Sequence, residues 1–89
     1  MAGSNKGLIE FPTQFSIKAF GEDEEGFAEL VLAIVQNHAP EVGQEALTRR
    51  SSRGGKYLAV TVTLTAETRQ QLEAIYQELK DHPRVIMLL

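Results

Sequence analysis

The segment from Tyr57 to Thr65, with the sequence Tyr-Leu-Ala-Val-Thr-Val-Thr-Leu-Thr, constrains the fold of this chain more than any other. Its aliphatic residues alternate with mostly hydroxylated ones, and successive side chains of a strand point to opposite faces of a sheet. The pattern therefore predicts a β-strand with one apolar face and one polar face. Other elements have to cover the apolar face, whereas the polar face can stay open.

The size and composition of the chain indicate a single globular domain. It has 89 residues, of which 43% are hydrophobic and 24% charged, and a net charge of −3 that argues against nucleic acid or an anionic membrane as partner. The lack of cysteine excludes disulfides, a thiol nucleophile and cysteine-ligated metal. No apolar run reaches the roughly 20 residues of a membrane span, and Met1–Gly7 does not resemble a secretory signal. We therefore expect a cytoplasmic protein.

The beginning of the chain predicts a tail, a short apolar segment and a strand. We expect residues 1–7 to be a flexible N-terminal tail and residues 8–89 to form the domain. Leu8–Pro12 is an apolar segment that we expect to dock on the edge of the core. Gln14–Phe20 is predicted to be the first strand, ended by Gly21, with three apolar residues on one face: Phe15, Ile17 and Ala19.

An amphipathic helix is predicted next. Glu22–Glu25 would open it, because acidic residues are favoured at the positive end of a helix dipole, and Pro40 would stop it at about Ala39. Between these points the apolar residues follow helical spacing: Phe27, Leu30, Val31, Ile34 and Val35.

A hairpin is predicted from the segment before Tyr57 and the strand Tyr57–Thr65, and its first strand has a weak pattern. Gln44–Ser51 has few apolar residues, which is typical of a sheet edge. Gly54 and Gly55 can supply the positive φ angles of the turn into Tyr57–Thr65.

The C-terminal part predicts a second helix and a last strand. Thr65 is expected to cap a helix over Ala66–Asp81, which Pro83 ends. Val85–Leu89 is predicted to be the last strand.

The element order βαββαβ predicts an α+β, ferredoxin-like sandwich, in which two helices cover one face of a four-stranded antiparallel sheet. The first and third strands would be central. The open face would then carry side chains of both central strands and one side of the last strand: Lys18, Phe20, Tyr57, Ala59, Thr61 and Thr63 with either Ile86 and Leu88 or Val85, Met87 and Leu89. Such a face can be solvated or can bury against a second copy.

Motifs spread over most of the chain carry a family resemblance. They are Glu10-Phe11-Pro12, Phe15, Lys18 and Gly21; His38-Ala39-Pro40; Ser51-Ser52 followed by a glycine and Tyr57; and Gln71, Tyr76, Leu79 and Val85-x-Met87-x-Leu89. With these the chain resembles the YbeD-like family of small bacterial proteins with no assigned activity. The resemblance implies a fold similar to ACT regulatory domains, which often pair and bind amino acids, and it implies no catalytic residue.

The sequence departs from the family pattern in two loops. Glu22–Glu25 is more acidic, and Gly54-Gly55 is an additional pair, so a ligand role of these loops is not carried over from the family. Carboxylates at the first of these loops would also repel an anionic effector.

Four of the nine basic residues lie in the predicted hairpin: Arg49, Arg50, Arg53 and Lys56. One hypothesis is an anion-binding tip, because arginine binds carboxylates and phosphates through two parallel hydrogen bonds. The other is a solvated turn whose charges discourage edge-to-edge pairing.

Other candidate sites have simpler explanations. The Glu22–Glu25 carboxylates could bind a divalent cation, but such clusters usually stabilise a helix start. His38 and His82 lie near predicted helix ends, where capping or packing explains them better than a metal site. Lys18, Thr61 and Thr63 form either a polar ligand floor or a solvated sheet face.

Two activities that occur on this topology are disfavoured. RNA-recognition modules stack bases on aromatic residues of both central strands, whereas Ala59 and Thr61 occupy the middle of this strand. Acylphosphatases share the topology but cradle phosphate after the first strand, where this chain is acidic. No serine–histidine or paired-carboxylate arrangement predicts catalysis.

We therefore expect a non-catalytic regulatory or adaptor domain that binds a protein partner or a small metabolite, without a cofactor or a metal, and that can form a homodimer through its open sheet face. The hypothetical binding residues are Lys18, Arg49, Arg50, Ser52, Arg53, Tyr57, Thr61 and Thr63. The alternative is a small accessory enzyme or factor in metabolite processing, and the genomic neighbourhood of the resembled family suggests lipoate.

Overall fold

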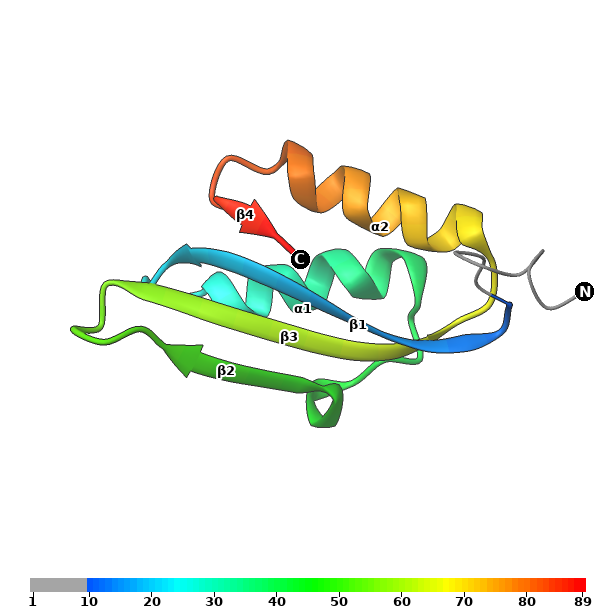
Figure 1. Cartoon of the computed structure of the whole chain (residues 1–89), viewed down its shortest axis with the longest axis horizontal. Helices are drawn as coiled ribbons and strands as arrows, with labels where there is room; N and C mark the ends of the chain where they lie inside the picture. Colours follow the sequence, from blue (N-terminus) through cyan, green and yellow to red (C-terminus); the bar gives the residue numbers. More distant parts are fainter. Residues whose placement is uncertain (1–9) are drawn as a thin grey trace, which may run out of the picture.

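The computed structural model describes residues 10–89 and has the predicted ferredoxin-like architecture. An antiparallel sheet with the strand order β2-β3-β1-β4 packs against two helices, α1 and α2, which lie on one side of it (Figure 1). The predicted tail over residues 1–7 lies outside the described residues, as do Leu8 and Ile9. The elements are β1 (Thr13–Glu22), α1 (Phe27–His38), the short 3-10 helix η2 (Gln44–Ala46), β2 (Leu47–Ser51), β3 (Tyr57–Ala66), α2 (Arg69–Asp81) and β4 (Met87–Leu88).

The core lies between the helices and one face of the sheet, as the alternation in β3 predicts. The aliphatic residues of β3 are buried and the residues between them are not. In β1, Ile17 and Ala19 complete the buried sheet face. The helices contribute further side chains that are fully buried: Phe27, Val31, Val35, Ile75 and Leu79.

Gly21 does not end β1, contrary to the prediction. The strand continues to Glu22, and Gly21 pairs with Leu58. A Cβ atom at Gly21 would lie 2.5 Å from the Phe27 ring and 2.7 Å from the carbonyl oxygen of Arg84. Glycine is therefore needed here for close packing, and the strand passes through it.

The acidic segment Glu22–Glu25 does not open α1, which is a second correction. Glu22 belongs to β1, and the helix begins at Phe27 after Gly26, whose φ of 87° is in the left-handed region. Only Glu29 is an acidic residue of the first turn. Glycine suits this bend because it has no Cβ, so the chain turns before the helix can start.

The side chains and backbone of the acidic segment instead contact other segments. Asp23 donates its N–H to the carbonyl of Lys56 at 2.9 Å and accepts a hydrogen bond from the Ser51 hydroxyl at 2.7 Å. The Arg84 guanidinium donates to the carbonyl of Glu25 at 3.2 Å and lies 3.9 Å from the Glu24 carboxylate. The segment thus joins the hairpin to the chain before β4.

The hairpin turn agrees with the prediction, although β2 is shorter. Gly54 and Gly55 have φ angles of 89° and 73°. Gln44–Ala46, predicted to be extended, forms η2, so that β2 starts at Leu47. β2 is an edge strand, as expected.

Thr68 caps α2, and Thr65 does not. β3 continues to Ala66, which is fully buried because it extends the apolar alternation by one more position. The helix then starts at Arg69, and the Thr68 hydroxyl accepts a hydrogen bond from the N–H of Gln71 at 3.1 Å.

β4 has only the residues Met87 and Leu88, against a prediction of five residues. Leu88 pairs with the buried Ala19 and lies on the helix side, whereas Met87 pairs with Phe20 on the open face. Leu89 exchanges two backbone hydrogen bonds with Lys18, at 2.8 and 3.2 Å. The open face therefore carries Met87 and Leu89, while Val85 packs against the core.

No helix among residues 10–89 has the length and apolar character needed to cross a membrane.

Candidate functional site

The strand register arranges the open face of the sheet in rows. One row runs from Lys18 through Thr61 to Thr48. The next row runs from Met87 through Phe20 and Ala59 to Arg50. No helix or strand of the described residues covers these rows, so their side chains are available to a ligand or partner.

Two shallow hollows lie on this face, and both include Arg50 and Ala59. The first, of about 410 Å³, lies beside the hairpin and is lined also by Phe20, Tyr57, Ser52 and Arg53. The second, of about 430 Å³, extends over Lys18, Thr48 and Thr61. Ala59 has the smallest side chain of its row, which leaves room between Phe20 and Arg50.

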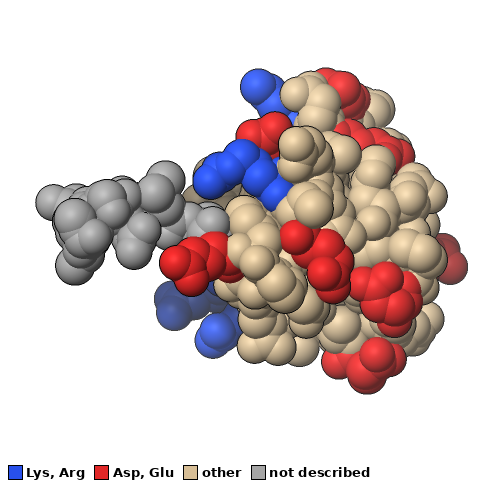
Figure 2. Space-filling view, turned by 90° about the vertical axis from the view of Figure 1, so that its right-hand side faces the viewer, with Lys and Arg blue, Asp and Glu red and all other residues tan. Residues whose placement is uncertain are grey.

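The charges of this face are largely uncompensated. Within residues 10–89, no carboxylate lies within ion-pair distance of Lys18, Arg50 or Arg53. The opposite end of the molecule from the hairpin has acidic side chains spread over its front and right side (Figure 2). At the hairpin end, Arg50 and Arg53 lie near the acidic segment Glu22–Glu25, whose Glu22 pairs with Tyr57 and whose Asp23 bonds to Ser51.

Arg49 and Arg50 are neighbours in the sequence, but their side chains leave β2 on different sides. Arg50 pairs with Ala59 of the open face, whereas Arg49 pairs with the buried Val60. The Arg49 guanidinium lies 3.6 Å from the carboxylate of Glu29 in α1, although Arg49 also touches the rim of the second hollow. Arg49 is thus partly neutralised.

The other predicted residues have distinct places. Ser52 accepts a hydrogen bond from the N–H of Tyr57 at 3.0 Å, so its hydroxyl stabilises the turn as well as lining the first hollow. Thr63 lies one row beyond the hollows and shares a 3.0 Å hydroxyl–hydroxyl hydrogen bond with Ser16. The structure brings the remaining predicted residues together around Arg50: Lys18, Arg53, Tyr57 and Thr61.

Comparison with known proteins shows to which family the chain belongs. The family described as "Protein of unknown function (DUF493)" matches residues 6–89, which is nearly the whole chain. The chain belongs to the DUF493 family. The likeness to the YbeD-like family drawn from the sequence motifs is thereby confirmed.

Relatives of this DUF493 chain match it over almost their full length. The UPF0250 protein NE1487 of Nitrosomonas europaea is 46% identical over 86 residues, which cover 97% of this chain and 99% of the relative. A UPF0250 protein of Chromobacterium violaceum is 40% identical over 89 residues and covers 100% of both chains. The solution structure of protein HP0495 from H. pylori matches with a TM-score of 0.75 and 13% identity, covering 100% of this chain and 93% of that one. This last likeness shows the fold.

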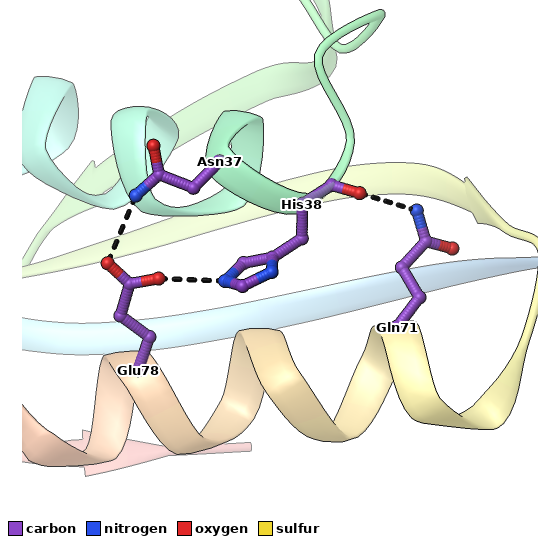
Figure 3. Close-up of polar contacts among 4 residues, drawn as sticks. All are labelled: Asn37, His38, Gln71 and Glu78. Atoms are coloured by element: carbon purple, nitrogen blue, oxygen red, sulfur yellow. Dashed lines mark hydrogen bonds and ion pairs between the residues drawn. The ribbon is translucent and has the colours of Figure 1, made fainter.

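In this DUF493 chain a second polar cluster joins the two helices (Figure 3). Glu78 shares a 2.7 Å hydrogen bond with Nε2 of His38 and accepts another from the Asn37 amide at 3.0 Å. The Gln71 amide donates to the backbone carbonyl of His38 at 2.8 Å. These contacts give His38 a packing role, and His82 accepts a local hydrogen bond from the backbone of Arg84 at 3.1 Å.

Sequence reasoning missed this helix-to-helix cluster, although a signal for it exists. Gln71 and Glu78 are seven residues apart and therefore lie on one face of α2, opposite the polar end of α1. Within residues 10–89, no group of three or more histidine, aspartate and glutamate side chains is arranged to hold a metal ion.

Proposed function

We propose that this DUF493 chain is a non-catalytic binding domain that takes an anionic group of a protein partner or of a small metabolite on its open sheet face. The observation that carries the proposal is the position of Arg50. Its side chain lies beside the small Ala59 at the meeting point of two hollows, without a carboxylate partner among residues 10–89.

The chemistry of the face suits a carboxylate or a phosphate. The Arg50 guanidinium can donate two parallel hydrogen bonds to such a group. Lys18 and the Thr61 hydroxyl lie in the adjacent row and supply a second cation and a further donor. A hydrogen bond to a charged group contributes about 1.5–3 kcal/mol, so a few of them support selective binding.

The apolar part of a ligand would rest on the hairpin side of Arg50. Phe20 and Tyr57 line the first hollow, and Tyr57 is 41% exposed. An anion with an apolar body, or an acidic protein surface with an apolar side chain, would contact both parts of the face. This combination fits a regulatory or adaptor role, in which the domain binds its ligand or partner and catalyses no reaction.

A thermal-shift screen with amino acids, nucleotides and lipoyl compounds tests the proposal. A ligand at 100 times its Kd stabilises a fold by about 2.7 kcal/mol, and each kcal/mol raises the Tm of a domain this small by roughly 4–8 °C. We expect Arg50→Glu to abolish the shift and Arg69→Glu, a charge reversal in α2, to preserve it. If the screen is flat, the wild type and Arg50→Glu are compared in partner capture from lysate.

Three results would count against the proposal. One is a ligand shift that is the same in Arg50→Glu as in the wild type, and another is an unchanged set of captured partners. Turnover of a lipoyl compound by the purified chain would favour the accessory-enzyme alternative instead.

A further inference from the structure

β4 lies beside the second half of β1 only, which leaves the first half of that edge without a neighbouring strand among the described residues. On this side β1 pairs with β4 only at Ala19 and Phe20, and Lys18 bonds to Leu89. No strand of the described residues lies beside Thr13–Ile17 on the same side. β1 therefore has a free edge over its first half.

The backbone groups that face this free edge follow from the alternation of the strand. The N–H and C=O of Lys18 bond to Leu89, so they point toward the β4 side. Backbone groups two residues apart in a strand point the same way, which directs those of Ser16 and Gln14 to the free edge. An unpaired row of donors and acceptors is a template for an added strand.

An apolar groove lies directly against this edge on the helix side. It has a volume of about 540 Å³ and is lined by Phe15 of β1, Leu88 of β4 and the α2 residues Leu72 and Tyr76, with Phe11 at one end. The Phe15 and Tyr76 rings meet edge to face, with centroids 6.4 Å apart. A strand added beside β1 would direct every second side chain into this groove, because Phe15 and Leu88 are on the helix side of the sheet.

The charged residues around the groove favour an acidic occupant. Arg69 and Lys80 line it together with a single carboxylate, that of Glu73. The Arg69 guanidinium lies over the Phe11 ring, 5.9 Å from its centroid. Within residues 10–89, neither Arg69 nor Lys80 has a carboxylate within ion-pair distance.

We propose that this groove binds an extended peptide segment of another protein, which adds as a strand beside Thr13–Ile17. Its backbone pairs with Gln14 and Ser16, its alternate apolar side chains enter the groove, and an acidic residue at either end meets Arg69 or Lys80. Main-chain pairing supplies affinity and the groove supplies selectivity, as in other cases of strand addition. The surface is separate from the anion site, which lies on the other face of the sheet.

Amide hydrogen exchange and shift mapping by NMR on the full chain test the proposal. The probes are peptides of about seven residues, a typical strand length, with alternating valine and threonine and an aspartate at each end. Their controls carry a proline at the centre, which removes a main-chain donor. We expect the amides of Gln14 and Ser16 to exchange rapidly in the free chain and slowly with the aspartate peptide, and the signals of Leu72 and Tyr76 to shift.

Two variants separate strand addition from other modes of binding. Gln14→Pro removes a donor that faces the free edge and no bond to β3, so it should abolish peptide binding while the Ile17 amide stays protected. Arg69→Glu should weaken binding of the aspartate peptide roughly five- to tenfold, the effect of about 1 kcal/mol or slightly more for one exposed charge pair. Arg50→Glu, which tests the anion site, should leave peptide binding unchanged.

The proposal is overturned if none of the aspartate peptides binds, or if Gln14→Pro binds them as well as the wild type. It is also overturned if the Gln14 and Ser16 amides are already protected in the free chain. Protection that depends on protein concentration would then identify a second copy as the occupant, and protection that does not would identify residues 1–9.

Discussion

Gly21 lies where β1, the start of α1 and the segment before β4 are in close contact. Its sequence context is that of a strand terminator, because a glycine precedes an acidic cluster. The structure shows a different cause, since the Phe27 ring and the Arg84 carbonyl fill the space that a side chain would need. The Arg84 carbonyl is distant in the sequence, and the Phe27 ring meets Gly21 only because the chain bends at Gly26, so the local pattern could not reveal the role of this glycine.

Replacement of Gly21 by alanine should therefore destabilise the fold by about 1–3 kcal/mol, as overpacking does. Thermal unfolding would show this as a fall of roughly 4–8 °C in Tm per kcal/mol. Gly43→Ala is the matched control, because the three atoms nearest to its Cβ would belong to the carboxylate end of the flexible Glu45 side chain. Equal melting temperatures for the two variants would contradict the packing role.

Tyr76 makes the stability of the chain depend on pH in the alkaline range. Its hydroxyl donates to the Leu89 carbonyl at 3.2 Å, and burial raises the pKa of the phenol above its usual value of 10.0. The folded chain therefore holds this proton more tightly than the unfolded chain. The resulting stability is fully present below pH 10.0 and is lost as the pH rises through the higher pKa of the folded state.

Urea unfolding at neutral pH and above pH 10.0 measures this contribution. Tyr76→Phe should lose less stability over that interval than the wild type, because it has no phenol to ionise. Tyr57→Phe, a substitution on the open face, should behave like the wild type. The explanation fails if Tyr76→Phe loses as much stability as the wild type between these two pH values.

At the scale of the elements, the patterns that depend on neighbouring residues predicted the structure well. The alternation in β3 indicated its buried face, and the order of the elements indicated the sheet topology. The ends of the elements depend on contacts across the fold and were predicted less well. Ala66 continues β3, where it pairs with Thr13 and is fully buried, and this moves the start of α2 past Thr65.

The N-terminal cap of α2 gives a direct test of where this helix starts. Thr68→Ala should destabilise the fold by about 1 kcal/mol, because the N–H of Gln71 loses its acceptor. Thr65→Ala should have little effect, since Thr65 is exposed and does not cap the helix. Chemical denaturation of both variants checks the ranking, and the reverse order would mean that the helix starts earlier.

At the scale of the whole molecule, two surfaces follow from the sheet and only one was foreseen. The open face was predicted from the alternation in β3, although the opposite directions of Arg49 and Arg50 required the register of the hairpin. The groove beside α2 was not predicted, because it exists only where β4 stops short of the first half of β1. In the register of β4, even the predicted five-residue strand Val85–Leu89 would lie opposite Lys18–Glu22, so the free edge follows from the register and not from the length of this strand.

The open face is the central claim, and NMR shift mapping with inorganic phosphate at constant ionic strength tests it most directly. We predict that the amide shifts concentrate at Lys18, Arg50, Ala59 and Thr61, and that they disappear in Arg50→Glu but persist in Arg69→Glu. Shifts that are absent, spread evenly over the molecule, or unchanged in Arg50→Glu would contradict the assignment of an anion-binding function to this face.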